Sequence, residues 1–90
     1  MMTLNLGYLA TFRLVAQRGS FSAAADVLGI SQPAVSLQVR QLEQFLQTRL
    51  IERTGRGVKA TAAGMALLLH GERIEQAVNE AVQSVNDCSQ

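Results

Sequence analysis

The sequence contains no tryptophan and a single cysteine, and aromatic residues make up only 4% of its 90 residues. Although 48% of the residues are hydrophobic, alanine and leucine must fill most of the interior, which favours closely packed helices over a β-sandwich. The lone Cys88 excludes an intramolecular disulfide and suits a reducing cytoplasm. A chain of this length predicts one domain, close to the smallest size that a single hydrophobic core stabilises.

Long hydrophobic runs and catalytic motifs are also missing. No stretch approaches the ~18 apolar residues of a membrane-spanning helix. The N-terminal segment carries no basic residue ahead of its apolar part, so we expect neither membrane association nor a signal peptide. His70 has no cysteine or carboxylate cluster at metal-ligand spacing, and Cys88 has no neighbouring base. The sequence therefore predicts no enzyme, no metal site and no cofactor in these residues.

Charge is distributed unevenly along the chain. The net charge of +1 alone argues weakly against a nucleic-acid partner. Residues 1–64, however, hold seven basic and three acidic side chains, whereas residues 65–90 hold one basic and four acidic ones. This asymmetry is typical of a DNA-binding head attached to a segment that stays away from the phosphates.

Residues 20–47 predict two helices joined by a tight turn. The first is alanine-rich and spans about residues 22–28. Gly29 ends it, because a residue without a Cβ adopts the left-handed conformation without a steric penalty. Ile30 is expected to fill the turn as an apolar plug, and Ser31 to cap the next helix through its hydroxyl.

The second of these helices has two distinct faces. Pro33 is favoured in its first turn, and one face carries apolar residues spaced by four, three and four positions, namely Val35, Val39, Leu42 and Leu46. The opposite face lacks the Glu/Lys mixture of an ordinary solvated surface and carries Gln32, Ser36, Leu37, Arg40 and Gln44. Any helical hairpin needs such periodicity, but the short turn and this composition favour a helix that reads a DNA major groove.

Further elements are predicted on both sides of this pair. A helix capped by Thr3 or Asn5 runs to about Arg18. After the pair, residues 50–53 and 58–60 form a candidate β-hairpin with Arg56 at its tip. Arg56 alone would be a solvated loop cation, but directly after a helix-turn-helix a contact with DNA is favoured. The core residues expected from these elements are Leu9, Phe12, Val15, Ala16, Phe21, Ala23, Ala24, Ala25, Leu50 and Val58.

A long last helix is predicted from its N-cap Thr61 to about Asp87. It cannot bury its heptad seam against the small head, so a symmetric dimer is expected. The predicted dimer contacts are Leu67, Ile74, Val78, Ala81 and Val85, with Gly64, Gly71 and Ala81 admitting a partner helix closely. In the alternative interpretation, Met65, Leu68 and Leu69 pack on the head, while the C-terminal end of the helix frays or leads into another domain. The two interpretations are compatible, and the dimer is favoured.

Over nearly its whole length, the sequence resembles the N-terminal domain of LysR-type transcriptional regulators. Residues 12–43, 50–61 and the pair Ala63–Gly64 carry the resemblance, with SQPAVS, the Leu42–Glu43 pair and the RTGRGV wing as its most specific motifs. It implies a mainly α fold, with a winged helix-turn-helix of three helices and a two-stranded wing at residues 1–60. A linker helix for dimerisation follows at residues 61–90. It further implies that the chain is a fragment, since family members carry a C-terminal domain that binds a small-molecule effector.

The resemblance also implies a function. Members of the family are bacterial transcription factors, in the cytoplasm and on the nucleoid, that bind an interrupted palindromic operator in double-stranded DNA. They form homodimers through antiparallel linker helices, with a tetramer as an alternative for the full-length protein. Residues matching Gln32, Ser36 and Leu37 read bases, the one matching Pro33 contacts a thymine methyl group or sugar, and the one matching Arg56 enters the minor groove. Phosphate contacts are implied for Ser22, Ser31, Arg40 and Arg53.

Two residues depart from the family pattern. Leu37 stands where the family often has arginine or another polar residue, so we expect an apolar contact with a thymine methyl group. Gln47 replaces the usual glycine after the second helix of the pair, so either it adopts a strained left-handed conformation or the helix continues. Two other interpretations stay open. One is a dimerisation or protein-interaction module with a helix-turn-helix scaffold, and the other is another winged-helix family.

Overall fold

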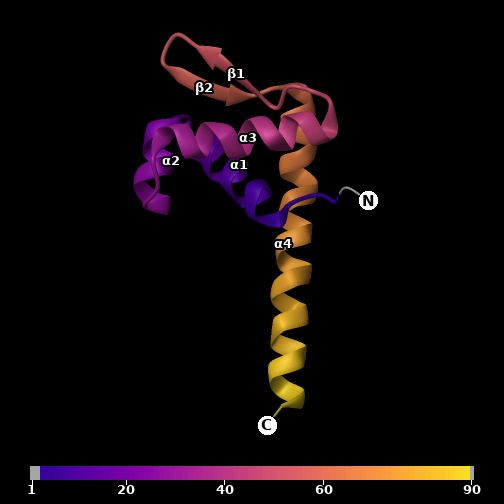
Figure 1. The fold of residues 1–90 in the computed structure, drawn as a ribbon. Coiled ribbons are helices and arrows are strands. Elements are labelled where there is room, and N and C mark those ends of the chain that lie inside the picture. Colours follow the sequence, from indigo (N-terminus) through magenta and orange to yellow (C-terminus); the bar gives the residue numbers. More distant parts are fainter. Residues whose placement is uncertain (1–2, 90) are drawn as a thin grey trace.

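Four helices and one two-stranded sheet make up the computed structural model, which describes residues 3–89. A head is formed by α1 (Leu6–Arg18), α2 (Phe21–Leu28), α3 (Gln32–Leu46), β1 (Ile51–Thr54) and β2 (Gly57–Ala60), and α4 (Ala62–Cys88) projects from it (Figure 1). The long dimension of 51 Å, against 27 and 23 Å, reflects this projection. The predicted mainly α winged helix-turn-helix with a long final helix is confirmed. None of the described helices is both long and apolar enough to cross a membrane.

Polar side chains cap the start of every helix described. The caps are Asn5, Ser20, Ser31 and Thr61, each accepting a hydrogen bond from a backbone N–H three residues ahead. Such a cap typically contributes about 1 kcal/mol. Ser20 is the one that was missed from the sequence: its Oγ accepts from the N–H of Ala23 at 3.0 Å, so α2 begins at Phe21 rather than at Ser22.

The hydrophobic core lies between α1, α2 and α3 and is closed by the wing. Leu46, which the sequence places on the apolar face of α3, is 36% exposed because α3 ends there. Ile30, predicted to fill the turn between α2 and α3, is 38% exposed. That turn is closed by the backbone instead, since the N–H groups of Gly29 and Ile30 both donate to the carbonyl of Ala25, at 2.9 and 3.3 Å. The buried apolar residues are Leu9, Phe12, Val15, Ala24, Ala25, Val35, Val39, Leu42, Leu50, Ile51 and Val58.

The two strands form an antiparallel hairpin in which Ile51 lies opposite Ala60. Two strands alone are marginally stable in water, and this pair depends on its attachment to the helices. The N–H of Val58 donates to the carbonyl of Gly19 at 3.1 Å, which ties β2 to the turn between α1 and α2. A Cβ on Gly57 would overlap that same carbonyl oxygen, so the close approach requires glycine at this position.

Two glycines let the first turns of α4 approach the head. A Cβ on Gly64 would overlap the carbonyl oxygen of Leu50, and one on Gly71 would lie 3.1 Å from Cδ of Arg13. The sequence prediction assigned both glycines to contact with a partner helix. The structure corrects this, because the close approach is made within the same chain.

The apolar side chains of α4 divide into a covered and an uncovered group. Leu67, Leu68 and Ile74 are partly buried against the core, so two residues that were predicted to lie in the dimer seam contact their own head. Met65 and Leu69, which the alternative placed on the head, are 60% and 56% exposed.

Gln47 ends α3 in the left-handed conformation, with φ 55° and ψ 41°. Its N–H donates to the carbonyl of Gln44 at 3.3 Å, and the N–H of Thr48 donates to that of Glu43 at 3.2 Å. The first of the two alternatives is therefore confirmed: the helix stops, and a residue with a Cβ occupies a conformation that favours glycine.

Replacing Gln47 by glycine should stabilise the protein. Gln47→Gly removes a left-handed strain of roughly 1–2 kcal/mol but adds unfolded-state entropy of about 0.4–1 kcal/mol, so we expect a gain of up to about 1.6 kcal/mol in the free energy of unfolding, measured by urea denaturation. Gln44→Gly, in the helical last turn, is the matched control and should lose about 0.5–1 kcal/mol. Equal losses for the two variants would contradict the strain.

Candidate nucleic-acid interface

The N-terminal half of α3 presents an outer face that the rest of the described chain leaves uncovered. Gln32, Pro33 and Arg40 are exposed, Leu37 is 49% exposed, and Ser36 is partly covered. This orientation is fixed because the opposite face of the helix is buried in the core. An amide, a hydroxyl, an apolar side chain and a guanidinium together suit base edges and phosphates in a major groove.

A buried polar contact fixes α3 against α1. Thr11 is 4% exposed, and its hydroxyl lies 2.7 Å from Oε1 of Gln38 and 3.1 Å from the carbonyl of Gly7. Nothing in the sequence pattern pointed to this pair. Gln38 therefore acts inside the head, although an amide in the middle of a recognition helix would suit a base contact.

The cations of the head fall into a paired and an unpaired group. Arg40 on α3, Arg53 on β1 and Arg56 in the hairpin turn are exposed, and none forms an ion pair with a carboxylate of residues 3–89. The ion pairs that do occur there are Arg13–Glu75, Arg49–Glu43 and Lys59–Glu52. Arg18 at the end of α1 is likewise exposed and outside these pairs, but the three guanidinium groups on α3 and the wing are the ones that stay available beside the outer face of α3 for phosphates or a minor groove.

A polar groove separates α3 from β1 and brings some of the predicted site residues together. Ser36 and Arg40 line it from the helix, and Arg53 lines it from the strand. The hairpin turn that holds Arg56 and the N-terminal end of α3 lie at the same end of the head, away from α4 (Figure 1).

Two predicted phosphate contacts lie outside this groove. Ser22 is exposed in the first turn of α2. Ser31 is the N-cap of α3, so its hydroxyl oxygen already accepts the N–H of Ala34, at 3.2 Å, while its O–H remains able to donate.

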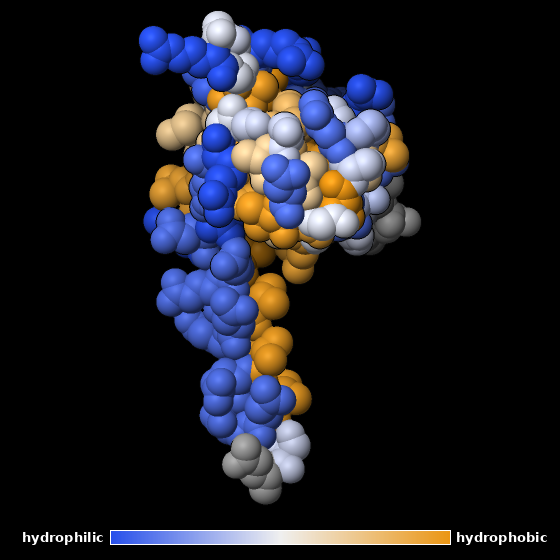
Figure 2. Space-filling model, turned by 90° about the vertical axis from the view of Figure 1, so that its left-hand side faces the viewer, coloured by the Kyte–Doolittle hydropathy of each residue, from blue (hydrophilic) through white to orange (hydrophobic). Residues whose placement is uncertain are grey.

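Beyond the head, α4 carries an apolar stripe on one side and polar residues on the other (Figure 2). Val78, Val82 and Val85 are 40%, 55% and 67% exposed and recur at four- and three-residue spacing. Val82 was missed from the sequence, which placed Ala81 between Val78 and Val85. Residues three and four positions apart both lie on one face of a helix, so the spacing alone does not choose between Ala81 and Val82.

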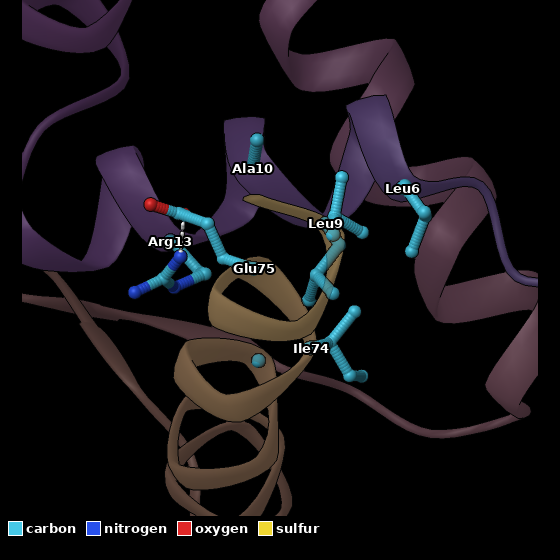
Figure 3. A pocket seen from close by; sticks show the side chains of 8 residues that line it. Leu6, Leu9, Ala10, Arg13, Ile74 and Glu75 are labelled. Atoms are coloured by element: carbon cyan, nitrogen blue, oxygen red, sulfur yellow. Dashed lines mark hydrogen bonds and ion pairs between the residues drawn. The ribbon is translucent and has the colours of Figure 1, made fainter. Parts of the chain in front are cut away.

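The stripe continues into a hollow between α1 and α4 (Figure 3). Leu6, Leu9 and Ala10 of α1 line one side, and Ile74 and Val78 of α4 line the other. An ion pair between Arg13 and Glu75 joins the two helices at the edge. The same apolar surface therefore runs from the head along the projecting part of α4.

The side chains that bind metal ions do not cluster anywhere in residues 3–89. No three side chains of His, Cys, Asp or Glu lie close enough together there to hold a metal ion. His70 and Cys88 are both exposed on α4.

Comparison with known proteins identifies the family. The family described as "Bacterial regulatory helix-turn-helix protein, lysR family" matches residues 6–65. The chain belongs to this family, and residues 6–65 are its LysR-type helix-turn-helix DNA-binding domain. Membership of another winged-helix family is thereby excluded.

Individual relatives and solved structures agree. A probable RuBisCO transcriptional regulator of Synechocystis sp. is 44% identical over 83 residues, which are 92% of this chain and 24% of that protein. A crystal structure of a CbnR_DBD–DNA complex superposes with a TM-score of 0.89 at 34% identity, covering 96% of this chain and 99% of that one. A BenM_DBD/catB site 1 DNA complex gives 0.90 at 32% identity, with 96% and 97% covered. The chain spans only 24% to 28% of the length of the probable RuBisCO regulators that it matches.

Proposed function

We propose that this chain binds an interrupted palindromic operator in double-stranded DNA as a homodimer, as part of a bacterial transcription regulator. The observation that carries the proposal is the uncovered outer face of α3, beside three arginines that have no carboxylate partner in the described chain. The DNA complexes of the CbnR and BenM domains support it. Such a regulator would act in the bacterial cytoplasm.

Each predicted side chain has a role in this proposal that fits its place in the structure. Gln32, Ser36 and Leu37 read base edges in the major groove, and Pro33 contacts a thymine methyl group or sugar. Because the wing holds Arg56 at the end of the head where α3 begins, Arg56 enters the adjacent minor groove. The phosphate contacts are Ser22, Ser31, Arg40 and Arg53.

The homodimer is proposed through α4. A monomer would leave Val78, Val82 and Val85 in water along a helix that extends away from its own head. Pairing with the same stripe of a second copy buries these side chains and is symmetric, as most homodimers are. Two heads related in this way present two α3 helices, which is why the operator should be palindromic. A tetramer and a small-molecule effector are proposed only for a longer regulator, outside residues 1–90.

A second candidate is a protein-interaction module that uses the helix-turn-helix only as a scaffold. The exposed stripe on α4 favours it, since an apolar helix face also suits a different protein partner. The two proposed functions differ in whether the head binds DNA, so a DNA-binding experiment distinguishes between them.

Affinity for a duplex selected from random-sequence DNA should fall steeply with salt. Arg40, Arg53 and Arg56 of two protomers place about six cations against the DNA, which predicts a loss of about a thousandfold between 50 and 200 mM salt, measured by fluorescence anisotropy. The apolar dimer contact itself should change little over this range in sedimentation experiments. Failure to select any duplex, or a flat salt dependence, would favour the protein-interaction module.

Leu37→Arg should change which base is preferred at one position of each half-site. A thymine methyl contact would be replaced by a guanidinium that pairs with guanine, a difference of about 1–3 kcal/mol at that base pair. Sequencing of DNA selected by the wild type and the variant measures this. Gln44→Arg, which adds the same charge on an exposed position near the end of α3, is the control and should keep the wild-type preference. Identical preferences for Leu37→Arg and the wild type would exclude the base contact.

Val82→Lys should weaken the dimer. Two valines lose burial and two charges enter the apolar stripe, so the dissociation constant should rise by about a hundredfold or more, measured by analytical ultracentrifugation. Gln83→Lys puts the same charge on the polar face of the same turn and should leave the dimer intact. Equal effects of the two substitutions would argue against pairing through this stripe.

A further inference from the structure

One carboxylate connects the recognition helix to the start of the wing. Oε2 of Glu43, on α3, accepts the backbone N–H of Leu50 at 2.7 Å and that of Ile51 at 3.3 Å. Nε of Arg49 donates to the same oxygen at 3.4 Å. The Glu43 side chain is only 14% exposed, so three donors converge on one largely covered oxygen.

The position of Glu43 in α3 explains this convergence. It lies one turn before the helix ends at Leu46, and the left-handed Gln47 then turns the chain back towards the strand. The N–H groups that begin β1 arrive beside the helix that the chain has just left, and a carboxylate is a strong acceptor for them. The same three donors offset the negative charge of the Glu43 carboxylate. Glu43 also lines the groove that holds Arg40 and Arg53.

The other attachments of the wing run to different elements. Val58 of β2 is bonded to Gly19, between α1 and α2, at 3.1 Å. Thr61 is bonded through its N–H to the carbonyl of Leu50 at 2.9 Å, and through its hydroxyl to that of Arg49 at 2.7 Å, which fixes the start of α4 to this segment. Among the hydrogen bonds of residues 3–89, those of Glu43 are therefore the ones that tie the start of β1 to α3 itself.

We propose that Glu43 is a positioning residue for DNA binding. By fixing the start of β1, it determines where Arg53 and Arg56 stand relative to the exposed face of α3, so that helix and wing engage one duplex together. The inference rests on the proposed DNA-binding function. In this proposal Glu43 itself does not contact DNA.

The anchoring is tested first without DNA, by amide hydrogen exchange of the 90-residue chain. Glu43→Leu removes the acceptor, and exchange at Leu50 and Ile51 should accelerate by about tenfold or more. Glu43→Gln retains an acceptor oxygen and should keep most of the protection. Glu52→Leu removes a carboxylate from the exposed face of the same hairpin and should leave both amides protected. Unchanged exchange at Leu50 and Ile51 in Glu43→Leu would overturn the anchoring.

The consequence for DNA is tested with the duplex that the wild type selects from a random library. Glu43→Leu should weaken binding about tenfold, and Glu43→Gln should bind within about threefold of the wild type. In a background that carries both Arg53→Ala and Arg56→Ala, Glu43→Leu should cost no more than about twofold, because both side chains that it positions are already gone. If Glu43→Leu weakens DNA binding by the same factor in both backgrounds, Glu43 does not act through these arginines, and the positioning role is overturned.

The two hypotheses fail in different ways. A wild-type chain that selects no duplex overturns the proposed function, and the exchange experiment then still decides whether Glu43 anchors the wing. A wild type that selects a duplex, with additive losses in the triple variant, overturns only the positioning role.

Discussion

The burial of one side of α3 is the constraint on which the rest of this structure depends. Val35, Val39 and Leu42 are almost completely buried between α1 and α2, and a core side chain of this size contributes about 1.5–3 kcal/mol by leaving water. Rotation of the helix would expose all three at once. Their burial therefore forces Gln32 and Leu37 outward, and the face available to DNA follows from the packing of the core.

Around this helix, hydrogen bonds and ion pairs decide which groups remain available. The hairpin depends on the helices for stability, and its attachment at Gly19 and Glu43 presents its arginines beside α3. Glu43 engages Arg49 within the head, while Arg56 at the hairpin tip has no carboxylate partner among residues 3–89. On α4, the first turns pack on the head and the remaining turns carry an apolar stripe, so one helix joins the head to a surface suited to a second copy.

Local rules predicted most of the fold, and contacts between distant residues account for what they missed. Helical periodicity and the caps at Asn5, Ser31 and Thr61 depend on residues within one turn of each other, so they can be read from the sequence. The role of Gly64 cannot, because the group that it approaches is the carbonyl of Leu50 in another element. Val82 was missed because Ala81 and Val82, three and four residues after Val78, both fit the spacing of one helix face. In the site, the exposed face of α3 was predictable, whereas the bonds of Glu43 arise only when the chain folds back.

The most direct measurement of the central claim is the change in backbone amide chemical shifts when the selected duplex is titrated into the 90-residue chain. The account predicts the largest changes in residues 31–40 and in the wing around Arg56, with little change on the polar face of α4. Changes confined to α4, or to the side of the head remote from the N-terminal end of α3, would contradict it.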